Sequence, residues 1–147
     1  MRHVAIMRKS WGLTQKIATG QKTIESRWYM HRSVPWGKII PGDIVYFKDS
    51  GEPVTLRAIA ADVLQFDNLT PARVNALLQQ YGNQHGLTSA DIPHYYELFK
   101  NKRYCMLIFL KGVEAVTPFH INKRGYGAMA AWLMTSDINK IKRTSSR

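Results

Sequence analysis

Three charged residues of complementary type stand close together in segment 20–28 of the chain: Lys22, Glu25 and Arg27. An ammonium or guanidinium group binds phosphate and carbonyl oxygens, whereas a carboxylate orients a cation, accepts a hydrogen bond from an exocyclic amine or moves a proton. Glu25 and Arg27 are two residues apart, so they share one face if this segment is a strand. We expect all three to bind a ligand, and Lys22 and Glu25 to be catalytic if the protein is an enzyme.

The same spacing also has a purely structural explanation. An acid and a base two residues apart on a strand form a surface salt bridge, which contributes only ~0–1 kcal/mol and requires no function. The residues of segment 20–28 alone therefore leave three alternatives open: a ligand-binding cleft, a catalytic pair and a surface ion pair.

Two further segments in the first half of the chain are candidate contact sites. Trp36 lies in a loop between Pro35 and Gly37, where an indole is hard to bury, so we expect it to stack on a ligand or to line a cleft. Lys48 and Ser50 are expected at a hairpin tip, where an ammonium group, a hydroxyl and backbone amides can bind a phosphate. The alternative for this tip is an ordinary solvated turn.

The segment 122–127 is a third candidate for ligand binding. It combines the cations Lys123 and Arg124 with Tyr126 and two glycines. Glycine lets the backbone approach a ligand closely, and the tyrosine can stack or donate a hydrogen bond. A basic loop that merely connects two packed elements has the same composition.

The net charge indicates the class of partner. The chain has 21 Lys and Arg residues against 10 acidic ones, which gives a formal net charge of +11. Such an excess raises the local concentration of polyanions, so RNA or another nucleotide-like ligand is the expected partner. A basic surface that serves only solubility is the alternative.

The histidines and the cysteine predict no metal site and no cofactor. His31, His85, His94 and His120 are scattered without the spacing of a metal-ligand motif, so we expect each to be a surface residue or a hydrogen-bonded polar residue. The single cysteine, Cys105, lies in an apolar run, which excludes a disulfide framework and predicts a buried thiol.

The length and the hydrophobic pattern predict one domain of residues 1–137, followed by a basic C-terminal tail of residues 138–147. A chain of 147 residues buries a core without disulfides or metals. No segment approaches the ~20 apolar residues of a membrane span, and the apolar run at the start is too short for a secretory signal. We therefore expect a cytoplasmic protein with no membrane contact.

Local patterns predict an α+β fold in which strands alternate with helices. Thr70 and Pro71 provide an N-cap and a first helical residue, and apolar residues follow at helical spacing. No glycine-rich strand-to-helix turn supports a doubly wound sheet. The segment 125–134 is apolar enough for a final helix or turn, with its methionines in the core. The predicted helices cover residues 11–19 (with Ser10 as N-cap), 70–81 and 89–99, and the predicted strands cover 4–7, 23–28, 43–47, 54–66 and 103–116.

Gly20, Lys22, Glu25 and Arg27 match the Gly-x-Lys-x-x-Glu-x-Arg pattern of the ASCH family. The resemblance continues through the Pro-Gly-Asp turn and the apolar strand of residues 41–47, and covers roughly the first half of the chain. It implies a fold similar to the PUA domain, a small mixed or antiparallel β-barrel flanked by helices. In this family the motif side chains line a cleft between helix and barrel.

The resemblance also implies a role in RNA metabolism. Members of the family are RNA-binding modules, some small bacterial members hydrolyse N-acetylated cytidine, and others are described as ribonucleases. Glu25 occupies the position of the nucleophilic threonine of the amidohydrolases. A carboxylate does not replace a hydroxyl that forms an acyl intermediate, so that mechanism is not expected to transfer unchanged.

We expect an RNA- or nucleotide-binding module with a basic cleft, and whether it is also an enzyme stays open. The alternatives are a hydrolase acting on a modified nucleoside or on RNA, and a protein-interaction adaptor whose basic charge is incidental.

Overall fold

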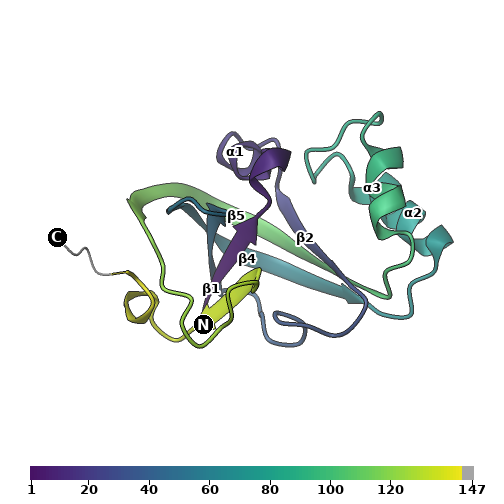
Figure 1. The fold of residues 1–147 in the computed structure, drawn as a ribbon. Helices are drawn as coiled ribbons and strands as arrows, with labels where there is room; N and C mark the ends of the chain where they lie inside the picture. Colours follow the sequence, from purple (N-terminus) through teal and green to yellow (C-terminus); the bar gives the residue numbers. More distant parts are fainter. Residues whose placement is uncertain (144–147) are drawn as a thin grey trace.

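The computed structural model describes residues 1–143, and residues 144–147 lie outside the described part of the chain. Three α-helices flank one six-stranded sheet (Figure 1). The strands are β1 (Arg2–Met7), β2 (Ile24–Tyr29), β3 (Ile44–Asp49), β4 (Val54–Phe66), β5 (Tyr104–Phe119) and β6 (Trp132–Thr135). The helices are α1 (Leu13–Ala18), α2 (Pro71–Tyr81) and α3 (Ile92–Phe99), with short 3₁₀ turns at η1 (Lys9–Trp11) and η2 (Ile138–Lys140).

The sheet is mixed, in the strand order β2-β5-β4-β3-β1-β6. Strand β1 runs parallel to β3, and every other neighbouring pair is antiparallel. The register shifts at several points along the long β4–β5 pair, and such irregularities increase the local twist of a sheet. The sheet curls into a half-barrel whose two edge strands are β2 and β6 (Figure 1).

The apolar side chains form three clusters around the sheet. The central cluster contains Phe47 and packs against Ile17 of α1. A second cluster lies under α2 and α3, where Leu77 and Leu107 are buried at the β2–β5 end of the sheet. A third joins β1, β3 and β6 to the chain around η2. Helices α2 and α3 therefore cover one end of the sheet, beside the edge strand that carries Glu25 (Figure 1).

The α+β class and most of the predicted elements are confirmed. Strand β4 has the predicted bounds, and α2 begins at Pro71 after Thr70, whose hydroxyl accepts a hydrogen bond from the Arg73 N–H at 3.2 Å. Cys105 is completely buried, and burial raises the pKa of its thiol, as expected for a structural cysteine. Helix α3 begins at Ile92, with Pro93 in its first turn.

The helix predicted over residues 11–19 is confirmed for residues 13–18, but its predicted start is wrong. Ser10 lies inside the 3₁₀ turn η1 and does not cap a helix. Gly12 then adopts a left-handed conformation, with φ of 64°, and α1 begins only at Leu13. A left-handed residue cannot continue a right-handed helix, so Gly12 separates the two short elements.

The segment 125–134 contains turns and a strand, with no helix. Its last residues begin strand β6, which pairs antiparallel with β1 and so becomes the edge of the sheet. Trp132 and Leu133 are buried there, but Met129 is 95% exposed, so the prediction of core packing is wrong for that methionine. Pairing with a distant strand overrides the local preference of an apolar segment.

The first residues of the predicted basic tail pack onto the sheet. Ile138 and Ile141 are buried in the third cluster, and Lys142 forms an isolated β-bridge with Ile121. The last four residues of the predicted basic tail, 144–147, lie outside the described residues. Within residues 1–143, no helix is long and apolar enough to cross a membrane.

We expect Thr70→Ala to lower the free energy of unfolding by about 1 kcal/mol, because the substitution removes the N-cap of α2. Thr70→Ser keeps the hydroxyl and serves as the matched control, with a smaller loss. Urea unfolding followed by circular dichroism measures both. Equal losses in the two variants would show that the hydroxyl does not stabilise the helix.

Candidate functional site

The three charged residues of the motif form one connected group at the start of β2. The Glu25 carboxylate lies 2.9 Å from an Arg27 guanidinium nitrogen and 3.5 Å from the Lys22 Nζ. The Ser26 backbone N–H donates to the same carboxylate at 3.0 Å, and Lys22 Nζ donates to the Ile24 carbonyl at 2.6 Å. Both Glu25 oxygens are therefore engaged by donors from its own strand and the residues before it.

Burial separates this group from an ordinary surface ion pair. The side chains of Lys22 and Glu25 are each 3% exposed, and that of Arg27 is 14% exposed. Desolvation lowers the pKa of Lys22, and the negative charge of Glu25 opposes this shift. Moving charges out of water costs several kcal/mol per ion unless they are paired, so each member of the group depends on the others.

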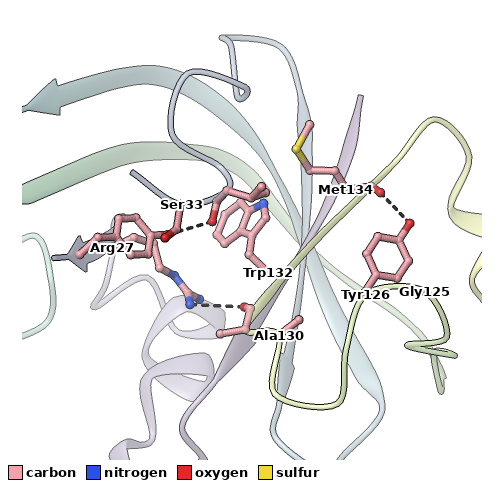
Figure 2. A pocket seen from close by; sticks show the side chains of 10 residues that line it. Arg27, Ser33, Gly125, Tyr126, Ala130, Trp132 and Met134 are labelled. Carbon is pink, nitrogen blue, oxygen red and sulfur yellow. Dashed lines mark hydrogen bonds between the residues drawn. The ribbon is translucent and has the colours of Figure 1, made fainter. Parts of the chain in front are cut away.

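Arg27 also joins the two edges of the sheet. Its guanidinium donates to the Ile6 carbonyl and the Ala131 carbonyl, each at 3.4 Å, and lies 5.1 Å from the centre of the Trp132 ring. Figure 2 shows the side chain directed from β2 toward the chain just before β6, with a dashed line marking the bond. Arg27 thus ties the edge strand β2 to the β1–β6 pair.

A groove of about 560 Å³ lies between β2 and the segment 123–131. From β2 it is lined by Glu25, Ser26 and Arg27, and from the facing loop by Lys123. Further lining comes from the turn after β1 and from the β3–β4 hairpin. Arg8 and Trp11 line the groove from the turn after β1, and Ser50 lines it from the hairpin. Trp28 of β2 and Phe99 of α3 also line it.

Two smaller spaces adjoin the groove. A niche of about 50 Å³ shares Trp11, Glu25 and Ser26 with the groove. Lys22 and His85 line the niche but not the groove. A second cavity of about 460 Å³ shares Arg27, Ala130 and Ala131 with the groove (Figure 2). The Arg27 side chain therefore borders both the groove and this second cavity.

The structure brings together some of the residues predicted from the sequence and separates others. Glu25, Arg27, Ser50 and Lys123 line the groove, and Lys22 lines the adjoining niche. Tyr126 lines the second cavity, where its hydroxyl donates to the Met134 carbonyl at 2.8 Å (Figure 2). The remaining three predicted residues line none of these cavities: Trp36, Lys48 and Arg124.

Trp36 and Lys48 occupy positions that the sequence did not indicate. Trp36 packs edge-to-face on Tyr104, with ring centres 5.2 Å apart. Lys48 lies within β3, not at the hairpin tip as predicted, because the strand continues to Asp49. Burial lowers the pKa of Lys48, and the positive charges of Lys123 and Arg143 lower it further. Lys48, Lys123 and Arg143 therefore lie close enough together for their positive charges to repel one another.

His85 contradicts the expectation of a surface or hydrogen-bonded histidine. It is 3% exposed, and its Nε2 has no hydrogen-bond partner within the described residues. Burial lowers the pKa of His85 to about 3, and the nearby charge of Lys22 contributes to the shift. His31, His94 and His120 are exposed, as expected.

Sequence reasoning missed the aromatic side of the site. Trp11 and Tyr95 meet edge-to-face, with ring centres 5.3 Å apart, and Phe99 stacks on Trp28 at 4.8 Å. These rings come from η1, α3 and β2, which are distant in the chain. No local pattern connects them, although the high aromatic content of residues 92–99 was a usable signal for a packed helix face.

The fold resembles that of a solved ASCH protein from Zymomonas mobilis. The two chains share 16% sequence identity and superimpose with a TM-score of 0.67, over 95% of this chain and 91% of that one. Two substituted forms of the same protein, also at 16% identity, give TM-scores of 0.67 and 0.65, each over 95% of this chain, and over 93% and 91% of theirs.

At this identity the likeness establishes the fold and nothing finer. No protein-family model matches the chain, and no curated protein matches it. The ASCH resemblance and the PUA-like fold predicted from the sequence are confirmed at the level of the fold.

We expect Glu25→Leu to lower the free energy of unfolding by about 3–5 kcal/mol, because it leaves Lys22 and Arg27 buried without their partner. The matched control is Glu114→Leu, which removes the exposed ion pair with Arg57 and should cost less than about 1 kcal/mol. Chemical denaturation measures both values. A Glu25 loss as small as that of Glu114 would mean that the two cations find other partners.

His85 should make the protein less stable in acid. Between its folded pKa of about 3 and its ordinary value of 6.5, the unfolded chain binds a proton that the folded protein does not. The stability contributed by the neutral imidazole is therefore complete above pH 6.5 and is lost as the pH falls toward 3. The expected slope is up to about 1.4 kcal/mol per pH unit.

The measurement is the free energy of unfolding as a function of pH for the wild type and His85→Gln. The variant should lack this part of the slope, whereas the exposed control His31→Gln should retain it. The pKa of buried His3 is also lowered, but His3 is present in all three proteins and cancels in the comparison. An unchanged slope in His85→Gln would contradict the assignment.

Proposed function

We propose that the chain is a cytoplasmic module that binds RNA or another nucleotide-containing ligand in the groove between β2 and the segment 123–131. One observation carries the proposal. Glu25, Arg27, Ser50 and Lys123, each singled out from the sequence and drawn from three distant segments, line the same open space. Its volume of about 560 Å³ falls within the range of roughly 300–1,000 Å³ that is usual for ligand pockets.

The charges that line the groove favour an anionic ligand. Arg8, Arg27 and Lys123 contribute positive charge, and Glu25 is already paired with Arg27 and Lys22. Lys123 donates one hydrogen bond to the Ala128 carbonyl at 2.6 Å, and an ammonium group has three donors. Two donors of Lys123 therefore remain for a phosphate, and the Ser50 hydroxyl lines the same groove.

The motif residues divide their roles in this proposal. Lys22 is buried and held by the Ile24 carbonyl and Glu25, so it positions the carboxylate and makes no phosphate contact. Arg27 positions the loop before β6 and presents only its partly exposed edge to the groove. Lys123, Arg8 and Ser50 then supply the main contacts to the anionic part of the ligand.

Hydrolysis of a modified nucleoside or of RNA is the alternative, with Glu25 as the base and Lys22 as the stabilising cation. Both Glu25 oxygens already accept hydrogen bonds, from Ser26 and Arg27, and this engagement supports binding over proton transfer. In an enzyme, Glu25→Gln would abolish turnover and retain ligand affinity, whereas in a binding module the affinity would fall.

Binding of a single-stranded oligoribonucleotide should weaken steeply with salt. Each phosphate contact contributes about −0.7 to the slope of log affinity against log salt. Lys123→Ala should therefore make the slope less negative by about that amount. The matched control is Lys111→Ala, since Lys111 is an exposed lysine of β5 outside the groove. Fluorescence anisotropy over a range of sodium chloride concentrations measures both.

A flat salt dependence would argue for the adaptor alternative, in which the positive charge is incidental. Equal effects of the Lys123 and Lys111 substitutions would mean that the whole basic surface attracts RNA, without a preferred groove. Either outcome would overturn the assignment of the ligand to this site.

A further inference from the structure

The niche beside the groove is lined by a different set of side chains from the groove itself. Trp11 and Phe99 border both spaces, and Tyr95 lines the niche alone. Lys123 and Ser50 line the groove but not the niche. The aromatic side chains therefore gather where the niche opens, away from the cation of the facing loop.

The aromatic rings are held firmly in place by one another. The Phe99 ring lies nearly parallel to that of Trp28, with an interplanar angle of 6° and centres 4.8 Å apart. Trp11 meets Tyr95 at 84°, and the guanidinium of Arg8 covers it at 4.6 Å from the ring centre. These contacts occupy one face of the Phe99 ring and one face of the Trp11 ring, and they fix the orientation of both rings, so that stacking on the opposite faces needs no rearrangement.

Polar groups with unused hydrogen-bonding capacity line the niche. The Ser26 Oγ accepts from the Trp28 Nε1 at 3.0 Å, which leaves the hydroxyl proton of Ser26 to donate. The His85 imidazole also lines the niche, and its Nε2 is closed off from solvent and has no partner within residues 1–143. An unpartnered buried nitrogen is costly, so a rotation of the ring that presents Nε2 to a ligand group gains a favourable contact.

The size of the niche limits what it accepts. A volume of about 50 Å³ has room for a ring edge or a small substituent, comparable with a few water molecules, but not for a whole nucleoside. The body of a planar ring must therefore stay at the mouth, where Trp11 and Phe99 also border the larger groove.

We propose that this niche is a base-recognition subsite: the heterocycle of a nucleotide stacks at its mouth on Trp11 and Phe99 and directs one polar edge toward Ser26 and His85. The inference rests on the proposed function and deepens it, because it assigns the base and the phosphate to different parts of one groove. Base stacking on aromatic side chains tolerates every base, whereas hydrogen bonds to the ring edge discriminate among them.

The first test needs no variant. Isothermal titration calorimetry compares ribose 5-phosphate with the four ribonucleoside 5′-monophosphates on the wild-type protein. Stacking of one base on an aromatic side chain is expected to tighten binding by at least about fivefold over the base-free sugar phosphate. At least one nucleotide should exceed the others further, because its edge matches the polar groups of the niche.

Three variants then locate the base. Trp11→Leu should remove most of the advantage of the nucleotides over ribose 5-phosphate, and this ratio of affinities is the readout because an effect on Arg8, which lies over Trp11, acts on both ligands and cancels. The matched control is Trp36→Leu, which alters a partly buried tryptophan that does not border the niche, and it should keep the advantage. His85→Gln should change the ranking of the four nucleotides by roughly tenfold or more for the preferred one. Thermal unfolding verifies that each variant is folded.

The outcomes separate this inference from the proposed function. Equal affinity for ribose 5-phosphate and all four nucleotides would overturn the base subsite while leaving the phosphate-binding groove in place. No binding of any of these probes or of a hexaribonucleotide would overturn both. Tighter binding of the hexaribonucleotide than of every mononucleotide would identify an RNA strand as the source of the base, and equal binding would identify a free nucleotide.

Discussion

The Glu25 carboxylate is buried only because a guanidinium, an ammonium group and a backbone N–H meet it together. The donors come from Arg27, Lys22 and Ser26. They reach the carboxylate together because residues 22–27 enter the edge strand β2. Each charge would be costly to bury alone. Strand β2 pairs on one side with β5, and its free side is the place where these side chains can turn toward the rest of the molecule.

Through Arg27 this local group controls the shape of the cavity around it. Because its guanidinium reaches the Ile6 and Ala131 carbonyls, the two edges of the half-barrel are connected by a side chain and not by a β-ladder. A side-chain connection leaves open space beside it, where the groove and the second cavity lie. A closed ladder would have filled this space with backbone.

Two buried nitrogens in this region, Arg27 Nε and His85 Nε2, have no hydrogen-bond partner within residues 1–143. Burial lowers the pKa of His85, and the nearby charge of Lys22 lowers it further, so the imidazole is neutral. Most buried polar atoms in proteins have a hydrogen-bond partner, so each unpartnered one requires an explanation. His85 lines the niche together with the Trp11 and Tyr95 rings, so a ligand that enters the niche lies near this unpartnered imidazole.

The elements with strong local signals and the charged motif could be recognised from the amino-acid sequence alone. The Thr70–Pro71 helix start, strand β4 and the shared strand face of Glu25 and Arg27 all follow from interactions within a few residues. Three features became visible only in the folded chain: the edge strand supplied by segment 125–134, the burial of the ion group, and the rings of η1 and α3 that border one niche. Burial and long-range strand pairing depend on residues distant in the chain, and no local pattern contains that information.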